Sequence, residues 1–394
     1  MKKKRILVYI AFMFIMIALG ASDSMRGIFS GIFESHFYLN KSQVSFIVTV
    51  SYIGNLVFIL LGSRMADKYD KKKVCIGIML LWALALLIYI FTDNYYCLLV
   101  GMFVSMGTST LMNTMINILS PTFFGAGAGM IVNTLFFTQG IGTSGNQSIT
   151  GRFATGYGSF RLVNIILLVL GTLGVAILML VKFPKDEREN TGETTENDTI
   201  KKKVTKTIVT NKAFIIFVLI FGFYFIAEHG VMNWWLMYCN ESLGLDKAAS
   251  ATYLSLFWGG MTVGRLLLSP FVLKLGVGRS IRIFGGIGTA LYVAGVFFGA
   301  PTLFMVSLSG LFISIIYPTL VLMINDYFEY DIIASATGYI ISAATVFDIA
   351  FNAVFGKIID TVGFSKSIMI FPVSMAVFYI LFMVLSGMNK EKSN

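Results

Sequence analysis

Apolar segments long enough to cross a membrane follow one another along almost the whole chain. A spanning helix needs about 20 mostly apolar residues. Twelve segments meet this requirement, at residues 6–33, 42–62, 74–92, 96–119, 127–150, 160–181, 213–237, 250–272, 281–299, 302–324, 334–357 and 367–387. Soluble domains carry about 25% charged residues, whereas this chain of 394 residues carries 13%. The sequence therefore predicts an all-α membrane protein with twelve transmembrane helices.

The distribution of basic residues predicts how these helices are oriented. If both termini lie in the cytoplasm, most of the 30 Lys and Arg residues fall on the cytoplasmic side, as the positive-inside rule requires. The net charge of +10 then reflects membrane topology, and we expect a lipid bilayer and no nucleic acid as the partner. The apolar run after Arg5 is longer than the core of a signal peptide, so we expect a retained first helix in a bacterial cytoplasmic (plasma) membrane.

A polar stretch divides the apolar segments six and six. Residues 182–212 have mixed charge, many threonines and no apolar periodicity, which predicts a cytoplasmic linker between halves 1–181 and 213–394. The halves look related: a Gly-rich, basic turn follows the second and the eighth segments, and an acid lies deep in the first and the seventh, Asp23 and Glu228. An internal duplication of this kind predicts a two-half transporter with its site at the interface of the halves.

The turn after the second segment carries a family resemblance. Ser63 to Lys72 resembles the helix 2–3 loop signature of the major facilitator superfamily, G-x-L-A-D-R-x-G-R-K, although Ser63 and Asp70 replace its glycines. The resemblance implies the major facilitator fold, with two pseudo-symmetric six-helix halves and transport by alternating access. It also implies gating residues at the cytoplasmic mouth, which are Asp67, Lys68, Lys71, Lys72 and, in the second half, Arg265.

A finer resemblance concerns the second half of the chain. Ala227-Glu228-His229-Gly230, Trp234-Trp235, the run from Trp258 to Arg265 and Ile316-Tyr317-Pro318-Thr319 resemble the fucose/glucose-type sugar–proton symporter branch. That resemblance implies import of a sugar together with protons.

Three acids lie within apolar segments and are candidates for proton coupling: Asp23, Glu228 and Asp348. An ionisable group near the bilayer centre costs about 2.5–3.5 kcal/mol on insertion scales, so its presence indicates a function. Asp23 and Arg26 are three residues apart and share a helix face. Two interpretations stay open, because Asp23 could carry the coupling proton or form a permanent structural pair with Arg26.

Glu228 has two apolar neighbours on the same helical stripe, Met232 and Trp235. A carboxylate beside an indole suits a sugar, whose ring stacks while its hydroxyls donate to the acid. Alternatively, Glu228 bonds a neighbouring helix and never titrates. His229 is rotated by about 100° from Glu228 on a helix and is therefore a weaker candidate.

The remaining candidates for substrate binding carry amide, hydroxyl, guanidinium or indole groups. They are Arg26, Tyr52, Asn55, Asn113, Asn117, Gln139, Asn233, Trp235, Trp258, Tyr317 and Asn352. Such groups can line a sugar site because most both donate and accept hydrogen bonds. They also hold membrane helices together, which is an equally good explanation for any single amide. Pro318 should kink the tenth helix, because proline removes a backbone donor.

These features favour a proton-coupled secondary importer of a small polar solute, a sugar in the first instance. The alternatives are an importer of organic or amino acid anions that uses Arg26, and an efflux antiporter, which the absence of a Gly-Pro pair in the fifth helix disfavours. A receptor that binds solute without moving it ranks lower. No nucleophile–base pair, metal-ligand spacing or nucleotide motif is present, so we expect no enzyme, metal or cofactor. The expected partners are a small-molecule solute and protons, and we expect a monomer.

Overall fold

The computed structural model describes residues 2–183, 205, 207–329 and 332–392, and it describes no side chains at 2–3, 61–68, 126, 334 and 388–392.

The first half contains α1 (Lys2–Phe37), α2 (Lys41–Lys68), α3 (Lys71–Phe91), α4 (Tyr95–Phe124), η1 (Gly125–Gly127), α5 (Ala128–Phe153) and α6 (Tyr157–Met179). The second contains α8 (Lys212–Glu241), α9 (Lys247–Leu275), α10 (Val277–Ser280), η2 (Ile281–Gly285), α11 (Gly286–Phe297), η3 (Ala300–Thr302), α12 (Leu303–Ile313), α13 (Ile316–Met323), η4 (Ile324–Asp326), α14 (Ile333–Val362), α15 (Phe364–Ser367) and α16 (Ile370–Lys392). Most of the predicted linker, 182–212, lies outside the described residues.

Eleven helical segments of the described chain are long and apolar enough to cross a membrane. α5 is equally long but more polar, because hydroxyl, amide and glycine residues fill most of 138–150. Part of the surface of α5 is shielded from lipid, because α5 packs between α1 of its own half and α9 of the other half. The predicted fold class, an all-α membrane protein with twelve long helices, is confirmed.

Short polar residues set several helix starts. The side chain of Asp70 accepts a hydrogen bond from the Lys73 amide at 2.9 Å at the start of α3, and Asp246 accepts one from the Ala249 amide at 2.7 Å at the start of α9. Each satisfies an amide that has no partner within the helix. The turns therefore fix where the apolar helices begin.

The predicted interruption of the tenth membrane segment is present. Its helix stops at Ile313 and resumes at Ile316, so that Ser314 and Ile315 form a turn. Pro318 lies four residues after Ser314, and a proline ring collides with the carbonyl group at that distance.

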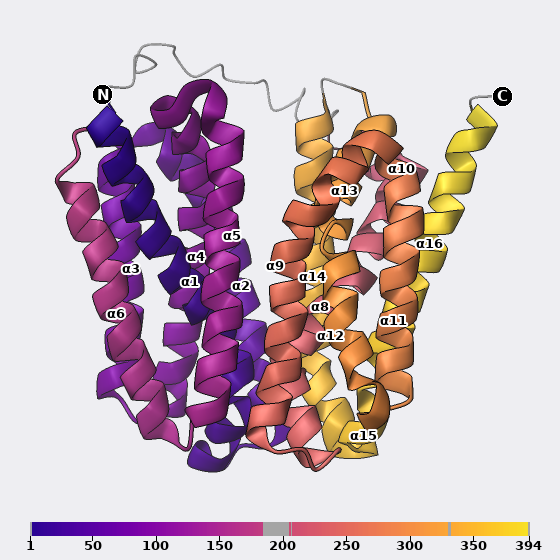
Figure 1. The fold of residues 1–394 in the computed structure, drawn as a ribbon, viewed down its shortest axis with the longest axis horizontal. Helices are drawn as coiled ribbons and strands as arrows, with labels where there is room; N and C mark the ends of the chain where they lie inside the picture. The colour runs from indigo at the N-terminus through magenta and orange to yellow at the C-terminus, as the bar shows by residue number, and fades with distance from the viewer. Residues whose placement is uncertain (1, 184–204, 206, 330–331, 393–394) are drawn as a thin grey trace.

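The two halves form two adjacent bundles (Figure 1). They meet where α1 contacts α8, α2 contacts α14 and α5 contacts α9. Glycines allow the closest approaches: a Cβ atom at Gly27 would lie 2.0 Å from the carbonyl oxygen of Met232, and one at Gly356 would lie 2.1 Å from that of Lys41. The helix backbones thus touch directly across the interface.

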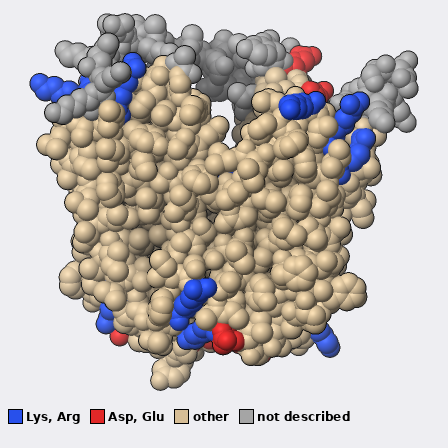
Figure 2. Space-filling model, viewed as in Figure 1, with Lys and Arg blue, Asp and Glu red and all other residues tan. Residues whose placement is uncertain are grey.

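Charged side chains lie mainly towards the two ends of the face shown in Figure 2, with an uncharged surface between them. One end carries both termini, and we call the opposite end, with residues 34–43, 237–247 and 360, the distal end (Figure 1). This distribution matches the requirement that charged groups stay out of hydrocarbon.

Candidate functional site

Arg26 lies at the centre of a polar network between the halves. Only 4% of its surface is exposed, and its guanidinium donates to Asn233 Oδ1 on α8 at 3.0 Å and to Ser51 Oγ on α2 at 3.0 Å. The guanidinium carbon also lies 4.6 Å from the ring centre of Tyr52, whose hydroxyl accepts a hydrogen bond from Asn233 Nδ2 at 3.1 Å. We call Arg26, Ser51, Tyr52 and Asn233 the Arg26 network. Gly27 explains its geometry, because the backbone contact there brings α8 against α1.

A second group of polar side chains adjoins the Arg26 network from α8 and α14. His229 Nδ1 lies 2.7 Å from Asp348 Oδ2, and Asn352 Nδ2 donates to Asp348 Oδ1 at 3.0 Å. The imidazole ring stacks on the ring of Tyr52, with 5.0 Å between ring centres. This contact joins the second group to the first across the interface.

Asp23 faces a different helix from Arg26. Its Oδ2 accepts a hydrogen bond from Ser109 Oγ on α4 at 2.9 Å, while its buried Oδ1 has no hydrogen-bond partner among the described residues. In the described part of the chain no ion pair within 4.0 Å joins Asp23 to Arg26, although the two charges interact at longer range. The close permanent pair considered from the sequence is therefore not formed. Asp23 therefore retains an open position for a proton, a cation or a donor group.

Glu228 points into the second half. It is 7% exposed and interacts electrostatically with Tyr224 on its own helix, Tyr292 on α11 and Tyr317 on α13. Its neighbour His229 occupies the interface instead. The weaker candidate from the sequence, His229, therefore contacts the other half, while Glu228 lies near tyrosines of its own half.

Among the described residues in the middle of the bundle, acids outnumber buried cations. The acids are Asp23, which is half-buried, and the buried Glu228 and Asp348, whereas the only buried cation is Arg26. The exposed Arg265 interacts with Tyr224 and Tyr317, two of the tyrosines near Glu228. A buried charge without a partner costs free energy, so protons or a hydrogen-bond-donating ligand would stabilise these carboxyl groups. Among the described residues, no group of three or more His, Cys, Asp or Glu side chains could hold a metal ion.

The other predicted amides lie around these groups but do not join them. Asn55 accepts a hydrogen bond from Thr110 at 2.7 Å within the first half, and Asn113 has a buried Oδ1 atom without a partner in the described part of the chain. Asn117 is exposed, and Gln139 is half-buried with its backbone carbonyl packed against Gly20.

The predicted aromatic candidates pack mainly within the second half. Trp235 is 1% exposed and lies beside Tyr238, whereas Trp258 is half-buried and contacts Phe257. Tyr317 packs against phenylalanines of α8. The packing interpretation accounts for their positions.

The structure describes the side chains of only some of the predicted gating residues. The side chains of Asp67 and Lys68 lie outside the described part of the structure. Lys72 donates to the carbonyl oxygens of Met179 and Val181 at 2.7 and 2.8 Å, so it ties α3 to the end of α6 within the first half. Lys71 is half-buried at the start of α3, and Arg265 is exposed on α9.

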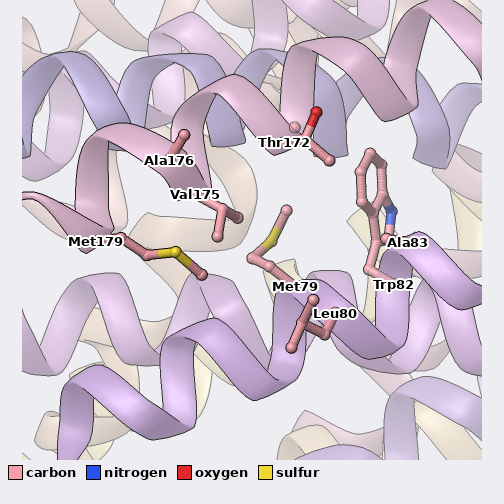
Figure 3. Close-up of a pocket in the computed structure, with 9 residues that line it drawn as sticks. Met79, Leu80, Trp82, Ala83, Thr172, Val175, Ala176 and Met179 are labelled. Atoms are coloured by element: carbon pink, nitrogen blue, oxygen red, sulfur yellow. The ribbon is translucent and has the colours of Figure 1, made fainter.

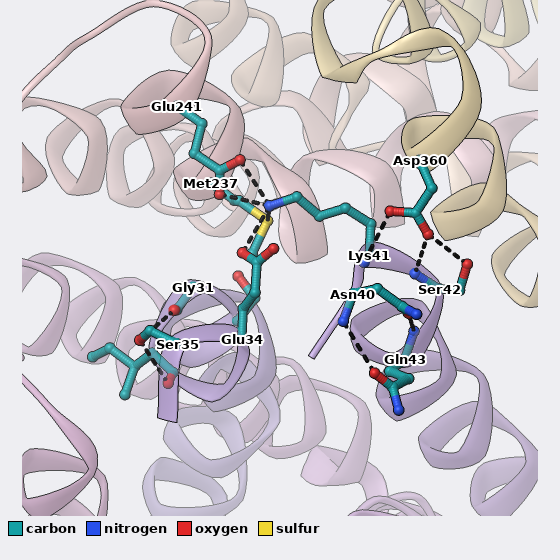
Figure 4. Close-up of polar contacts among 12 residues, drawn as sticks. Gly31, Glu34, Ser35, Asn40, Lys41, Ser42, Gln43, Met237, Glu241 and Asp360 are labelled. Atoms are coloured by element: carbon teal, nitrogen blue, oxygen red, sulfur yellow. Dashed lines mark hydrogen bonds and ion pairs between the residues drawn. The ribbon is translucent and has the colours of Figure 1, made fainter. Parts of the chain in front are cut away.

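The distal end holds a cluster of charged residues that the sequence analysis did not single out (Figure 4). Lys41 Nζ lies 2.7 Å from a carboxylate oxygen of Glu34 and 2.7 Å from one of Glu241, which belongs to the other half. Asp360 at the end of α14 accepts hydrogen bonds from the Lys41 and Ser42 amides, at 3.2 and 3.0 Å, and from Ser42 Oγ at 2.7 Å. These contacts fasten the halves together at this end.

A separate cavity of about 210 Å³ lies between α3 and α6 and is lined almost entirely by apolar groups (Figure 3). Its walls include Met79, Trp82, Val175 and Met179. It contains none of the candidate site residues, and a polar solute would find almost no hydrogen-bonding group in it. We exclude it as the binding site for a polar solute.

Two residues in these networks, Ser51 and Ser109, were missed as candidates from the sequence, and a third, His229, was considered only a weaker candidate. Serines in membrane helices commonly bond their own backbone, as Ser51 Oγ does to Val48 O at 2.7 Å, so the sequence gives no signal for them. For His229 a signal existed, since a histidine within a membrane segment is rare.

Comparisons with known proteins agree with this architecture. The family model for the Major Facilitator Superfamily matches residues 6–338. A putative glucose/galactose transporter of Helicobacter pylori is 26% identical over 275 residues, which cover 68% of this chain and 64% of the relative. A cis,cis-muconate transport protein of Acinetobacter baylyi is 28% identical over 150 residues, which cover 36% of each chain.

The matched region thus spans less than two thirds of the length of these curated relatives. A crystal structure of a D-xylose-proton symporter superposes with a TM-score of 0.75 and 12% identity, covering 96% of both chains. At that identity the likeness shows the fold alone.

Proposed function

Because the chain belongs to the major facilitator superfamily, a family of transporters, we propose that it imports a sugar together with protons by alternating access. The Arg26 network is the proposed solute site, and Asp23 is the proposed coupling residue. Glu228 and Asp348 are further acids that we propose to take part in coupling. The transporter acts as a monomer in the cytoplasmic membrane, with both termini in the cytoplasm.

The observation that carries this proposal is the Arg26 network itself. It gathers a guanidinium, an amide and two hydroxyl groups from both halves, near the middle of the bundle. The guanidinium donates hydrogen bonds, and the amide and hydroxyl groups both donate and accept them, which suits the hydroxyl groups of a neutral sugar. The relative named as a glucose/galactose transporter supports the same substrate class.

Proton coupling is supported by the excess of buried acids. Moving a carboxylate through a dry constriction costs much more than moving a neutral acid. Protonation of Asp23 would therefore allow the loaded carrier to reorient. Since Asp23 has an open oxygen and lies one helical turn from Arg26, it can respond to solute at the Arg26 network.

The distal contacts support a specific state of the transport cycle. Lys41 and Asp360 close the distal end, which would be the outer side if the termini are cytoplasmic. We propose on this basis that the carrier is closed on its outer side in this state. Asp67, Lys68, Lys71, Lys72 and Arg265 are proposed to form the cytoplasmic gate that closes in the opposite state.

A second candidate function is import of an organic anion. It is favoured by one observation: the guanidinium of Arg26 has no carboxylate within 4.0 Å among the described residues, and carboxylates are its preferred partners. The relative named as a cis,cis-muconate transport protein fits this alternative.

Uptake by proteoliposomes distinguishes the two functions. An inward proton gradient should drive accumulation of labelled D-glucose or D-galactose, and the sugar should carry protons inward with it. Strong inhibition of sugar uptake by a dicarboxylate, with proton-driven accumulation of that acid, would favour the anion transporter. Equal sugar uptake with and without the proton gradient would contradict proton coupling.

A further inference from the structure

His229 is held in one orientation by three neighbours. Its Nδ1 atom bonds Asp348 Oδ2 at 2.7 Å. The ring stacks on Tyr52 from the other half, with 5.0 Å between centres and 28° between planes, and on Phe225, with 5.4 Å and 18°. One hydrogen bond and two ring contacts leave the imidazole little freedom to rotate.

Asp348 is itself fixed. Its side chain is 2% exposed, and its second oxygen accepts a hydrogen bond from Asn352 Nδ2 at 3.0 Å. Ser45 on α2 donates to the backbone oxygen of Asn352, which ties this part of α14 to the first half. When Asp348 is ionised, its carboxylate can only accept hydrogen bonds, and the imidazole hydrogen of neutral His229 then lies on Nδ1.

The opposite nitrogen, Nε2, is available to a ligand. The side chain of His229 is 25% exposed, in contrast to Asp348, and no described residue forms a hydrogen bond with Nε2. With the hydrogen on Nδ1, Nε2 of the neutral ring is an acceptor. The imidazole ring itself stacks on Tyr52, which is part of the Arg26 network.

We propose that His229 binds the substrate, with Nε2 accepting a hydrogen bond from a hydroxyl group of a neutral sugar, and that Asp348 is its positioning residue. The inference rests on the proposed function and narrows it. A carboxylate ligand has no hydrogen to donate at neutral pH, so Nε2 in this form selects hydroxyl donors over acids. The guanidinium of Arg26 can only donate hydrogen bonds to the same ligand, and His229 supplies an acceptor.

The chain contains 2 histidines, which makes a direct test practical. His36 pairs with Asp93 within the first half near the distal end, at 2.5 Å, and serves as the reference. In protein labelled with nitrogen-15 at histidine, the His36→Gln variant leaves His229 as the single imidazole signal. We expect a protonated Nδ1 and an unprotonated Nε2, and saturating D-galactose or D-glucose should shift the Nε2 resonance.

Two variants extend this test to function. His229→Phe should raise the KM for uptake by roughly tenfold with little change in maximal rate. The reason is that it removes a hydrogen bond to the sugar that is equally strong in the bound state and in the transition state of transport. Asp348→Asn should disturb the tautomer seen by NMR and raise KM less, because the histidine remains. His36→Gln should transport at the wild-type rate.

Each outcome separates this inference from the proposed function. Sugar that raises the melting temperature but leaves the Nε2 resonance unmoved would overturn the role of His229 and leave sugar transport standing. A hydrogen on Nε2 in the sugar-bound protein would overturn the acceptor role. If neither sugar raises the melting temperature of the wild-type protein, the proposed sugar function and the hydroxyl ligand of His229 fail together.

Discussion

The distal end and the middle of the interface differ in how their charged side chains are paired. At the distal end Lys41 lies between two carboxylates, Glu34 and Glu241, and Asp360 accepts three hydrogen bonds. In the middle, Arg26 bonds only neutral groups, and Asp23 has one hydroxyl partner and one empty oxygen. The distal end is complete without a ligand, whereas the middle is not. We infer that the first region closes the carrier and the second recognises its cargo.

The largest effect should come from Arg26→Gln. Removing the guanidinium leaves the buried oxygens of Asn233 and Ser51 without this donor, which costs about 1–3 kcal/mol for each group and corresponds to a loss of uptake of roughly a hundredfold. Arg152→Gln is the matched control, because exposed Arg152 also spans the interface, donating to Thr252 at 2.9 Å. We expect that control to transport within about twofold of wild type. Equal losses of uptake in Arg26→Gln and Arg152→Gln would contradict a special role of the Arg26 network in recognising the cargo.

Asp23→Asn should affect proton-driven accumulation of sugar but not the exchange of sugar across the membrane. The amide cannot release a proton, so accumulation driven by a proton gradient should disappear while exchange of labelled for unlabelled sugar continues. The exposed acid Asp93, paired with His36, provides the control variant Asp93→Asn. Retained accumulation in Asp23→Asn vesicles would show that the coupling proton binds elsewhere.

Gly356→Ala should hinder closure of the distal end. The added Cβ would lie 2.1 Å from the Lys41 carbonyl oxygen, and overpacking of this kind costs about 1–3 kcal/mol. We expect roughly tenfold slower uptake, since 1.4 kcal/mol is tenfold in an equilibrium. Gly338→Ala on the same helix is the control, because nothing lies within 4 Å of its new atom. Similar rates for the two variants would mean that the α2–α14 contact is not needed during transport.

Asp360→Asn should have the smallest effect. Asp360 accepts hydrogen bonds from neutral groups, which contribute about 0.5–1.5 kcal/mol each, and asparagine keeps an acceptor for the Ser42 amide. We expect uptake to change by about twofold to fivefold, with unchanged sugar affinity in a calorimetric titration. Asp326→Asn, at an exposed position near the end that carries the termini, should change neither quantity. A loss of sugar affinity in Asp360→Asn would place part of the binding site at the distal end.

The sequence was sufficient for the helices because lipid imposes a simple rule on charge and length. It placed the fifth span at 127–150, and the structure has Ala128–Phe153. It gave 6–33 for the first span, whereas α1 runs Lys2–Phe37, since hydropathy marks the membrane and not the ends of a helix that extends beyond it.

The site was less accessible to sequence reasoning. Arg26, Tyr52 and Asn233 were candidates, and the structure brings them together. Glu228 was preferred to His229 because it is an acid, but α8 is buried on nearly all sides, so apolar periodicity does not say which face meets the other half. The pairing of Lys41 with Glu241 joins turns of different halves, and at the sequence level both looked like ordinary polar helix ends.

Equilibrium binding to the Arg26→Gln variant tests the central claim most directly, because it separates recognition from movement. Purified wild-type, Arg26→Gln and Arg152→Gln proteins would be titrated with D-galactose and D-glucose in a calorimeter. We predict that wild type and Arg152→Gln bind one of these sugars with the same affinity, and that Arg26→Gln gives no binding heat at concentrations that saturate the other two. Wild-type affinity in the Arg26→Gln variant would contradict the assignment of the solute site to the Arg26 network.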